Sequence, residues 1–103
     1  MSLFLHPLRH NLVYTIFNRE YKFTLGESIK KETMDLIKNI YRANSSINKK
    51  QLIEVARENI EMIRLDLRML KDFKQLNLRK FVFLNEKIEV ISKQLVAWKN
   101  SSK

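Results

Sequence analysis

The sequence predicts an all-α protein, and three observations lead to this fold class. The chain has one glycine and one proline in 103 residues, so almost nothing in it interrupts a helix. Hydrophobic residues make up 45% and charged residues 30% of positions, which is compatible with helices that are apolar on one face only. Hydrophobic residues of the second half recur at steps of three and four, the spacing of a bundle helix: Phe81, Leu84, Ile88, Ile91, Leu95 and Trp98.

Length and composition restrict the protein further. A chain of this length forms one domain that buries roughly two-thirds of its unfolded surface. The absence of cysteine excludes disulfides, thiolate catalysis and sulfur-ligated zinc, and it suits a reducing compartment. The start of the chain is broken by His6, Pro7 and Arg9, and no apolar run approaches the ~20 residues of a membrane span. We therefore expect a soluble cytoplasmic protein without a membrane partner.

The first half predicts two helices separated by a polar segment. Pro7 suits a first helical turn, which places one helix at 7–17 with Leu8, Leu12, Val13 and Ile16 facing inward. Residues 18–23 are polar and charged. A second helix is expected at 24–44, because Thr24 and Glu27 have the spacing of a capping box. Gly26 would lie in its first turn, where another helix could approach. The inward face would be Leu25, Ile29, Leu36, Ile40 and Ala43.

The second half predicts two longer helices, at 48–73 and 78–99, with Asn77 as the cap of the latter. The links between helices are short, so neighbouring helices run antiparallel. The expected architecture is therefore an antiparallel up-down four-helix bundle with a short first helix. The core-facing residues of the helix at 48–73 would be Leu52, Ala56, Ile60, Ile63, Leu67 and Leu70.

A second apolar row lies off this core-facing row. It repeats every seven residues on the two later helices, at Val55, Met62, Met69 and Leu76 and then at Phe83, Val90 and Ala97. Such a row either widens the core-facing arc or forms a subunit interface, because long exposed apolar rows are unusual on monomers. We favour the interface, and hence an oligomer.

Basic residues are in excess and are unevenly distributed. Twenty Lys and Arg against eleven Asp and Glu give a formal charge of +9, which favours an anionic partner such as nucleic acid over a merely soluble surface. Lys38, Arg42, Lys49 and Lys50 form one cluster at one end of the bundle. Phosphate contacts are expected at the other cluster and at one further residue of the same heptad row: Arg57, Arg64, Arg68, Lys71, Lys74, Arg79 and Lys80. The alternative is a solvated face with intrahelical ion pairs.

No catalytic constellation is visible. His6 and His10 have the spacing of two helical metal ligands, but Pro7 lies between them and no third ligand is evident. The sequence also lacks the Glu-x-x-His pairs of di-iron bundles and the motifs of base-reading domains. We expect no enzymatic activity, no metal and no cofactor, and any nucleic-acid contact would be to backbone charge and shape.

Several segments together resemble one bacterial four-helix-bundle family. They are residues 17–29 (FNREYKFTLGESI), 40–44 (IYRAN), 52–73 with LRML at 67–70, and 88–101 ending in WKNS. In order and spacing they resemble the accessory variability determinant (Avd) proteins of diversity-generating retroelements and the related proteins encoded in 23S rRNA intervening sequences. The chain departs from that family at Asn18, where proline is frequent, at Ser92, where glycine is frequent, and in its short first helix.

The resemblance implies a homopentameric barrel of four-helix bundles. It also implies a basic accessory protein that binds the element's reverse transcriptase and nucleic acid during mutagenic retrohoming, without an active site. A protein-interaction bundle of the intervening-sequence type, with no reverse-transcriptase partner, is the alternative. Neither the polymerase and its template, nor RNA against DNA preference, nor the number of subunits can be deduced from the sequence.

Overall fold

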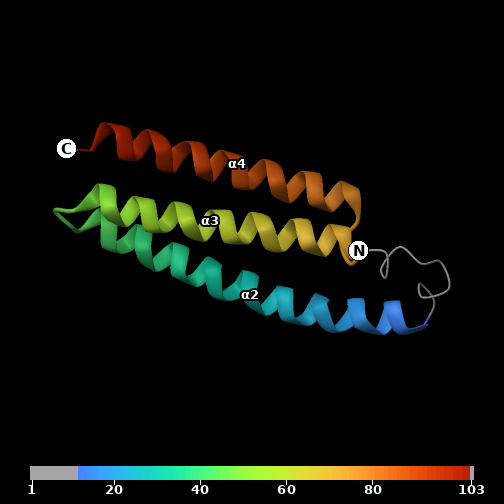
Figure 1. Cartoon of the computed structure of the whole chain (residues 1–103). Coiled ribbons are helices and arrows are strands. Elements are labelled where there is room, and N and C mark those ends of the chain that lie inside the picture. Colours follow the sequence, from blue (N-terminus) through green and yellow to red (C-terminus); the bar gives the residue numbers. More distant parts are fainter. Residues whose placement is uncertain (1–11, 103) are drawn as a thin grey trace.

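The computed structural model describes residues 12–102, and it describes side chains from Arg19 onward. These residues form three α-helices and no strand: α2 (Leu12–Asn44), α3 (Lys49–Asp72) and α4 (Leu78–Ser101). Figure 1 shows α3 between α2 and α4, with each helix antiparallel to the next along the chain. The expected all-helical class is confirmed. The expected fourth helix is not present in the described part of the chain.

The predicted break between helices at 18–23 is wrong, because α2 runs without interruption from Leu12 to Asn44. Residues 18–23 contain neither glycine nor proline, and Asn18 occupies the position where the resembling family often has proline. Tyr21 also stacks on Phe73 at the end of α3, with ring centroids 5.1 Å apart. Residues 7–11 of the expected first helix lie outside the described residues.

The expected capping box at Thr24 and Glu27 is wrong for the same reason. Thr24 lies inside α2, and its hydroxyl donates to the carbonyl of Glu20, one turn earlier, at 3.2 Å. Threonine makes this back-bond within helices when no cap is needed. The predicted approach of another helix at Gly26 is also not seen among the described residues, because none from another element lies within 4 Å of the position a Cβ would occupy there.

The core lies mainly between α2 and α3. The expected inward face of α3 is confirmed, except that Leu52 is only partly buried, and Ile53, which we did not predict, has no exposed surface. On α2, Ile29 and Ile40 pack at the edge of the core. Buried apolar residues of α2 and α3 are Leu25, Leu36, Ala43, Ile53, Ala56, Ile60, Ile63, Leu67 and Leu70.

Polar side chains join α2 to α3 inside this interface. Asn39 donates from Nδ2 to Oδ1 of Asn59 at 2.9 Å, and Asn59 donates in turn to Glu32 at 2.8 Å. One heptad further along α3, the Ser28 hydroxyl donates to the buried Asp66 carboxylate at 2.6 Å. Because a buried polar group without a partner costs about 1–3 kcal/mol, these pairs disfavour any other register of the two helices.

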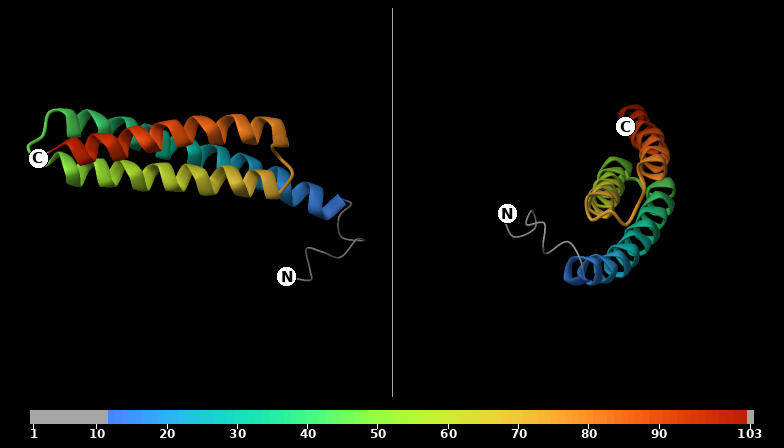
Figure 2. Two further views of the ribbon diagram at one scale, coloured as in Figure 1. Left: turned by 90° about the horizontal axis from the view of Figure 1, so that it is seen from above. Right: turned by 90° about the vertical axis from the view of Figure 1, so that its right-hand side faces the viewer.

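The third helix, α4, is packed less deeply. Only Ile88 and Leu95 are buried there, whereas Phe81, Leu84, Ile91 and Trp98 pack at the edge of the core. The predicted cap is confirmed, because Asn77 accepts a hydrogen bond from the backbone N–H of Lys80 at 2.8 Å. Two further views show α4 lying along α3 for its whole length (Figure 2).

Replacing Gly26 by alanine tests the continuous α2 helix. Glycine is less favourable than alanine inside a helix by about 0.5–1 kcal/mol, and a Cβ at this position clashes with no described residue. We expect Gly26→Ala to raise the free energy of unfolding by about that amount, as measured by urea denaturation. A loss of stability would instead place a close helix neighbour at Gly26.

Replacing Thr24 by alanine separates a helix interior from a helix start. At an N-cap the change would cost about 1 kcal/mol. Inside a helix it removes a β-branched side chain and is neutral or stabilising. We therefore expect Thr24→Ala to leave the urea midpoint unchanged or higher, and a clearly lower midpoint would restore the predicted capping box.

Candidate nucleic-acid interface

A hollow between α3 and α4 brings together part of the predicted basic cluster. It has a volume of about 390 Å³ and lies near the turn that joins the two helices. Residues from both helices line it: Glu61, Arg64, Leu65, Arg68, Phe81 and Asn85. The two arginines are four residues apart and therefore project from the same face of α3. The hollow is thus a mixed polar and apolar groove with a cationic wall.

Arg64 is already occupied by acidic neighbours. Its guanidinium forms an ion pair with Glu89 of α4, and its Nε lies 3.5 Å from the carboxylate of Glu61. The Arg64 side chain is about one-third exposed. Arg64 therefore ties α4 to α3, and an anion in the groove would have to compete with two carboxylates for it.

Arg68 and Lys71 supply the remaining positive charge on this wall. Arg68 is exposed and has no ion-pair partner among residues 19–102. The Nζ of Lys71 lies 4.8 Å from the ring centroid of Phe81, a cation–π contact, and 3.8 Å from the carboxylate of Asp72. The aromatic ring places the lysine ammonium at the edge of the groove, where the exposed Asp72 carboxylate offsets part of its charge.

The other members of the predicted cluster do not line the groove. Lys74 lies in the turn between α3 and α4, with a positive φ of 60°. Arg79 and Lys80 are exposed in the first turn of α4. Arg79 lies about 200° around the helix from Phe81, which lines the groove, so it projects from the opposite side. The end of the bundle is therefore positive on several faces, while two of the predicted residues, Arg64 and Arg68, line the groove and Lys71 lies over Phe81 at its edge.

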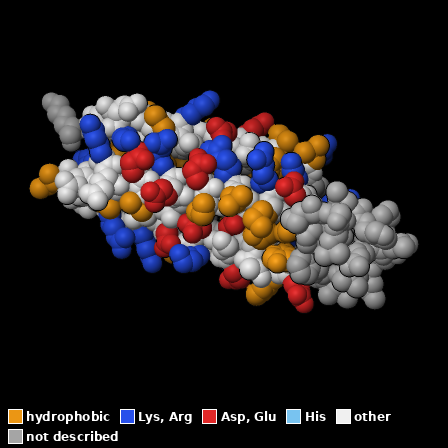
Figure 3. Space-filling view, viewed as in Figure 1, with side chains coloured by type: hydrophobic (Ala, Val, Ile, Leu, Met, Phe, Trp, Pro, Cys, Tyr) orange, Lys and Arg blue, Asp and Glu red, His pale blue; other side chains and the backbone are white. Residues whose placement is uncertain are grey.

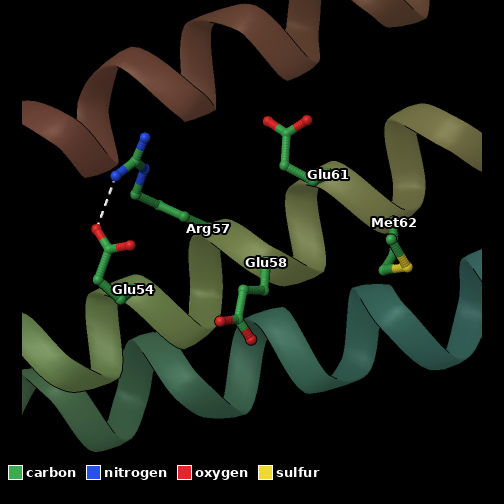
Figure 4. Close-up of a pocket in the computed structure, with 5 residues that line it drawn as sticks. All are labelled: Glu54, Arg57, Glu58, Glu61 and Met62. Atoms are coloured by element: carbon green, nitrogen blue, oxygen red, sulfur yellow. Dashed lines mark hydrogen bonds and ion pairs between the residues drawn. The ribbon is translucent and has the colours of Figure 1, made fainter.

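Arg57, the first predicted phosphate contact, belongs to a different environment. It forms an ion pair with Glu54 at 2.7 Å, in a hollow of about 430 Å³ lined by Glu54, Arg57, Glu58, Glu61 and Met62. Figure 4 shows Glu58 pointing toward α2 and Glu61 toward α4. The hollow holds three carboxylates and one guanidinium, which is already paired with Glu54, so the charges there disfavour a bound phosphate and favour a structural role for Arg57.

Glu54 is the centre of this second group of charges. It accepts hydrogen bonds from Lys99 of α4 at 2.5 Å and from Arg57 at 2.7 Å. The hydrogen bond from Lys99, followed by that from Arg57, lowers the pKa of Glu54 below its ordinary value of 4.5. Glu54–Lys99 and Arg64–Glu89 thus fasten α4 to α3 at two separate points along its length.

The predicted second apolar row is divided by the structure. Val55, Met62, Phe83 and Val90 are exposed, with 55% of Phe83 and 54% of Val90 accessible to solvent. Met69 and Leu76 instead pack against the core and widen it. In Figure 3 hydrophobic side chains lie among mixed acidic and basic ones on the face in view. The exposed residues remain available for an interface between subunits.

Sequence reasoning missed an exposed row on α2. Phe23, Met34 and Tyr41 are accessible by 72%, 53% and 74%, respectively. The signal for this row was present in the sequence, because the spacings of 11 and 7 residues are close to whole numbers of helical turns. It was obscured by the assumed break at 18–23, which left Phe23 outside any helix.

Two further findings concern the described residues only. Residues 12–102 hold no group of three or more His, Asp or Glu placed to bind a metal ion, and His6 and His10 lie outside this range. None of the helices in the same range is long and apolar enough to cross a membrane.

The fold and the groove define a small basic helical protein in which charged residues, and not a deep cavity, form the candidate site. Comparison with family models then makes the assignment specific. The model of the bAvd-like family matches residues 8–102, nearly the whole chain. The protein therefore belongs to the bAvd-like family, as its sequence segments indicated. No curated protein and no solved structure matches the chain.

The ion pairs of Glu54 predict a specific pH dependence. Because the folded-state pKa is lowered, ionised Glu54 stabilises the fold above pH 4.5, and this contribution is lost as the pH falls through the lowered value. We expect Glu54→Gln to reduce the thermal unfolding midpoint at neutral pH and to match the wild type in acid. Melting curves measured across the acidic range test this.

Glu58→Gln is the matched control, because Glu58 lies one turn further on and has no ion pair among residues 19–102. Its difference from the wild type should be small at neutral pH. If Glu58→Gln lowered the midpoint as much as Glu54→Gln, general charge effects would explain both.

Proposed function

We propose that this protein is a nucleic-acid-binding accessory subunit that associates with a retroelement reverse transcriptase during diversity-generating mutagenic retrohoming. Membership of the bAvd-like family supports this proposal, because such an accessory role is what the resemblance to Avd proteins implies. The protein acts in the cytoplasm without catalysis, metal or cofactor. Its contribution is to hold RNA or complementary DNA near the polymerase.

The observation that carries the proposal is the cationic wall of the α3–α4 groove. Arg68 is exposed without a carboxylate partner in the described part of the chain, and Lys71 is positioned by Phe81. The formal charge of +9 adds a long-range attraction for polyanions. An open groove with no built-in base-reading elements suits phosphate contacts, which give affinity with little sequence preference.

Oligomerisation belongs to the same proposal. The exposed apolar residues Val55, Met62, Phe83 and Val90 would lie between subunits, and the family resemblance implies a pentamer. Each added subunit brings another cationic groove, so weak individual phosphate contacts become one avid array. The polymerase would then meet a ring of equivalent surfaces.

A charge reversal at Arg68 tests the nucleic-acid site. We expect Arg68→Glu to weaken binding of RNA and DNA about threefold to tenfold per site at low salt, and to reduce the dependence of log Kd on log salt by about one. Fluorescence anisotropy at several salt concentrations measures both quantities.

Lys93→Glu makes the same change of charge at an exposed position of α4 without an ion pair among residues 19–102. It should affect binding much less than Arg68→Glu. Equal losses for the two variants would show that net charge, and not the groove, determines affinity.

A charge placed in the exposed apolar row tests the oligomer. An unpaired charge buried at an interface costs about 3–5 kcal/mol, so Phe83→Glu should shift the mass measured by light scattering to smaller species. Gln94→Glu, at an exposed position of the same helix, should leave the mass unchanged. A wild-type protein that is monomeric at all concentrations would remove this part of the proposal.

The second candidate is a protein-interaction bundle of the 23S rRNA intervening-sequence type with no polymerase partner. The internal use of Arg57, Arg64 and Lys99 in ion pairs favours it, because those charges then serve the fold. A gel-shift assay with RNA and DNA at about 150 mM salt separates the two candidates, since only the accessory subunit retains nucleic acid there.

A further inference from the structure

A second basic surface lies on α2, away from the α3–α4 groove. It is a hollow of about 330 Å³ formed by one turn after another of the same helix. Its lining residues are Arg19, Lys22, Phe23, Gly26, Glu27 and Lys30. This hollow and the groove share no lining residue, so they are separate sites.

Gly26 lines the hollow and carries no side chain. Beyond its own stretch of helix, no atom of the described residues lies within 4 Å of the position that its Cβ would occupy, so the helix backbone is open there. Phe23 stands almost one turn before Gly26 and Lys30 about one turn after it. A flat group can therefore approach the helix between an aromatic ring and an ammonium group.

Phe23 is the unusual residue of this surface. Its side chain is 72% exposed. Leu25, two residues later, is in the core, so Phe23 projects about 200° around the helix from this buried residue. Burying a phenylalanine side chain is worth about 1.5–3 kcal/mol, and this ring gains little of it within the subunit. The ring face is thus free to stack on a partner.

The charges around Phe23 select an anionic partner. The lining holds three cations and one carboxylate. That carboxylate, of Glu27, forms an ion pair with Lys30, with Nζ and Oε1 3.4 Å apart. Neither Arg19 nor Lys22 forms an ion pair within residues 19–102. At ~1.5 Å per residue, Arg19 to Lys30 spans about 16 Å, which gives room for more than one phosphate.

We propose that this α2 hollow binds single-stranded nucleic acid, with a base stacked on Phe23 and the adjoining phosphates held by Arg19, Lys22 and Lys30. Interleaved aromatic and cationic side chains are the combination that single strands require. Duplex bases are already stacked and cannot reach the ring. A lipid surface would need a broader apolar face than one phenylalanine.

This proposal rests on the proposed nucleic-acid-binding function and makes it more specific, because it assigns unpaired bases to α2 and leaves backbone charge to the α3–α4 groove. On a template that is partly single-stranded, the α2 site would then bind the unpaired bases and the α3–α4 groove the phosphate backbone. A polymerase substrate has this form wherever the template is being copied.

Binding of a labelled oligouridylate of about 15 nucleotides, compared with a duplex of equal length, tests the α2 site by fluorescence anisotropy. We expect Phe23→Leu and Gly26→Leu to weaken single-strand binding at least about fivefold and to leave duplex binding unchanged. Phe23→Tyr keeps the ring and should bind as the wild type does. Both positions face open space, so these variants are expected to fold.

Arg68→Glu distinguishes the failure of this inference from that of the proposed function. If Arg68→Glu weakens binding and Phe23→Leu does not, the α2 site is overturned and the groove stands. If the wild type binds neither oligonucleotide, both proposals fail. Equal displacement of the oligouridylate by polyglutamate of the same charge would show that charge alone, without base stacking, determines binding, and would also overturn the α2 site.

Photo-crosslinking with 5-bromouridine in the oligonucleotide gives the position directly. We expect mass spectrometry to find crosslinked peptides from residues 19–30. Crosslinks confined to α3 and α4 would overturn the α2 site whatever the affinities of the variants.

Discussion

The packing of α2 against α3 is the constraint on which the rest of the molecule depends. Ala43 and Ala56 have no exposed surface and let the two helices approach closely, while Ile53 and Ile60 fill the space between them. The hydrogen bonds of Asn39, Asn59 and Glu32, with that between Ser28 and Asp66, admit one register only. This register fixes how the exposed faces of α2 and α3 are placed relative to each other.

The attachment of α4 explains why the candidate site holds fewer free charges than the composition implies. With two buried side chains, α4 gains less from apolar burial than its neighbours and relies on ion pairs from Arg64 and Lys99 as well. A cation held between carboxylates contributes less to a polyanion partner, because the partner must displace them. Among the residues that line the groove, Arg68 is the cation without an ion-pair partner in the described part of the chain, and Lys71 at its edge also lies 3.8 Å from Asp72. Fold stability and the proposed binding therefore compete for the basic residues of α3.

The sequence predicted much of this fold. The periodicity of α3 and α4, the cap at Asn77 and the turn near 44–48 all depend on neighbours close in the chain, and the structure confirms them. The break at 18–23 was wrong because a polar segment was interpreted as a loop, although its residues are compatible with a helix and Tyr21 finds a distant partner in Phe73. The polar contacts at Asn59 and Asp66 could not be predicted, since their partners lie on another helix.

The sequence by itself determined the helical class, the apolar faces of α3 and α4, the excess of positive charge and the family. The first three properties follow from composition and from spacing along one helix, which are local, whereas the family rests on the match of its model to residues 8–102. Only the tertiary structure decided which charged residues pair between helices: Arg64 pairs with Glu89 and Lys99 with Glu54, whereas Arg68, Arg19 and Lys22 form no ion pair with any described residue. An ion pair between two helices depends on their relative register and on the rotation of each helix about its axis. Neither can be deduced from the residue spacing along a single helix.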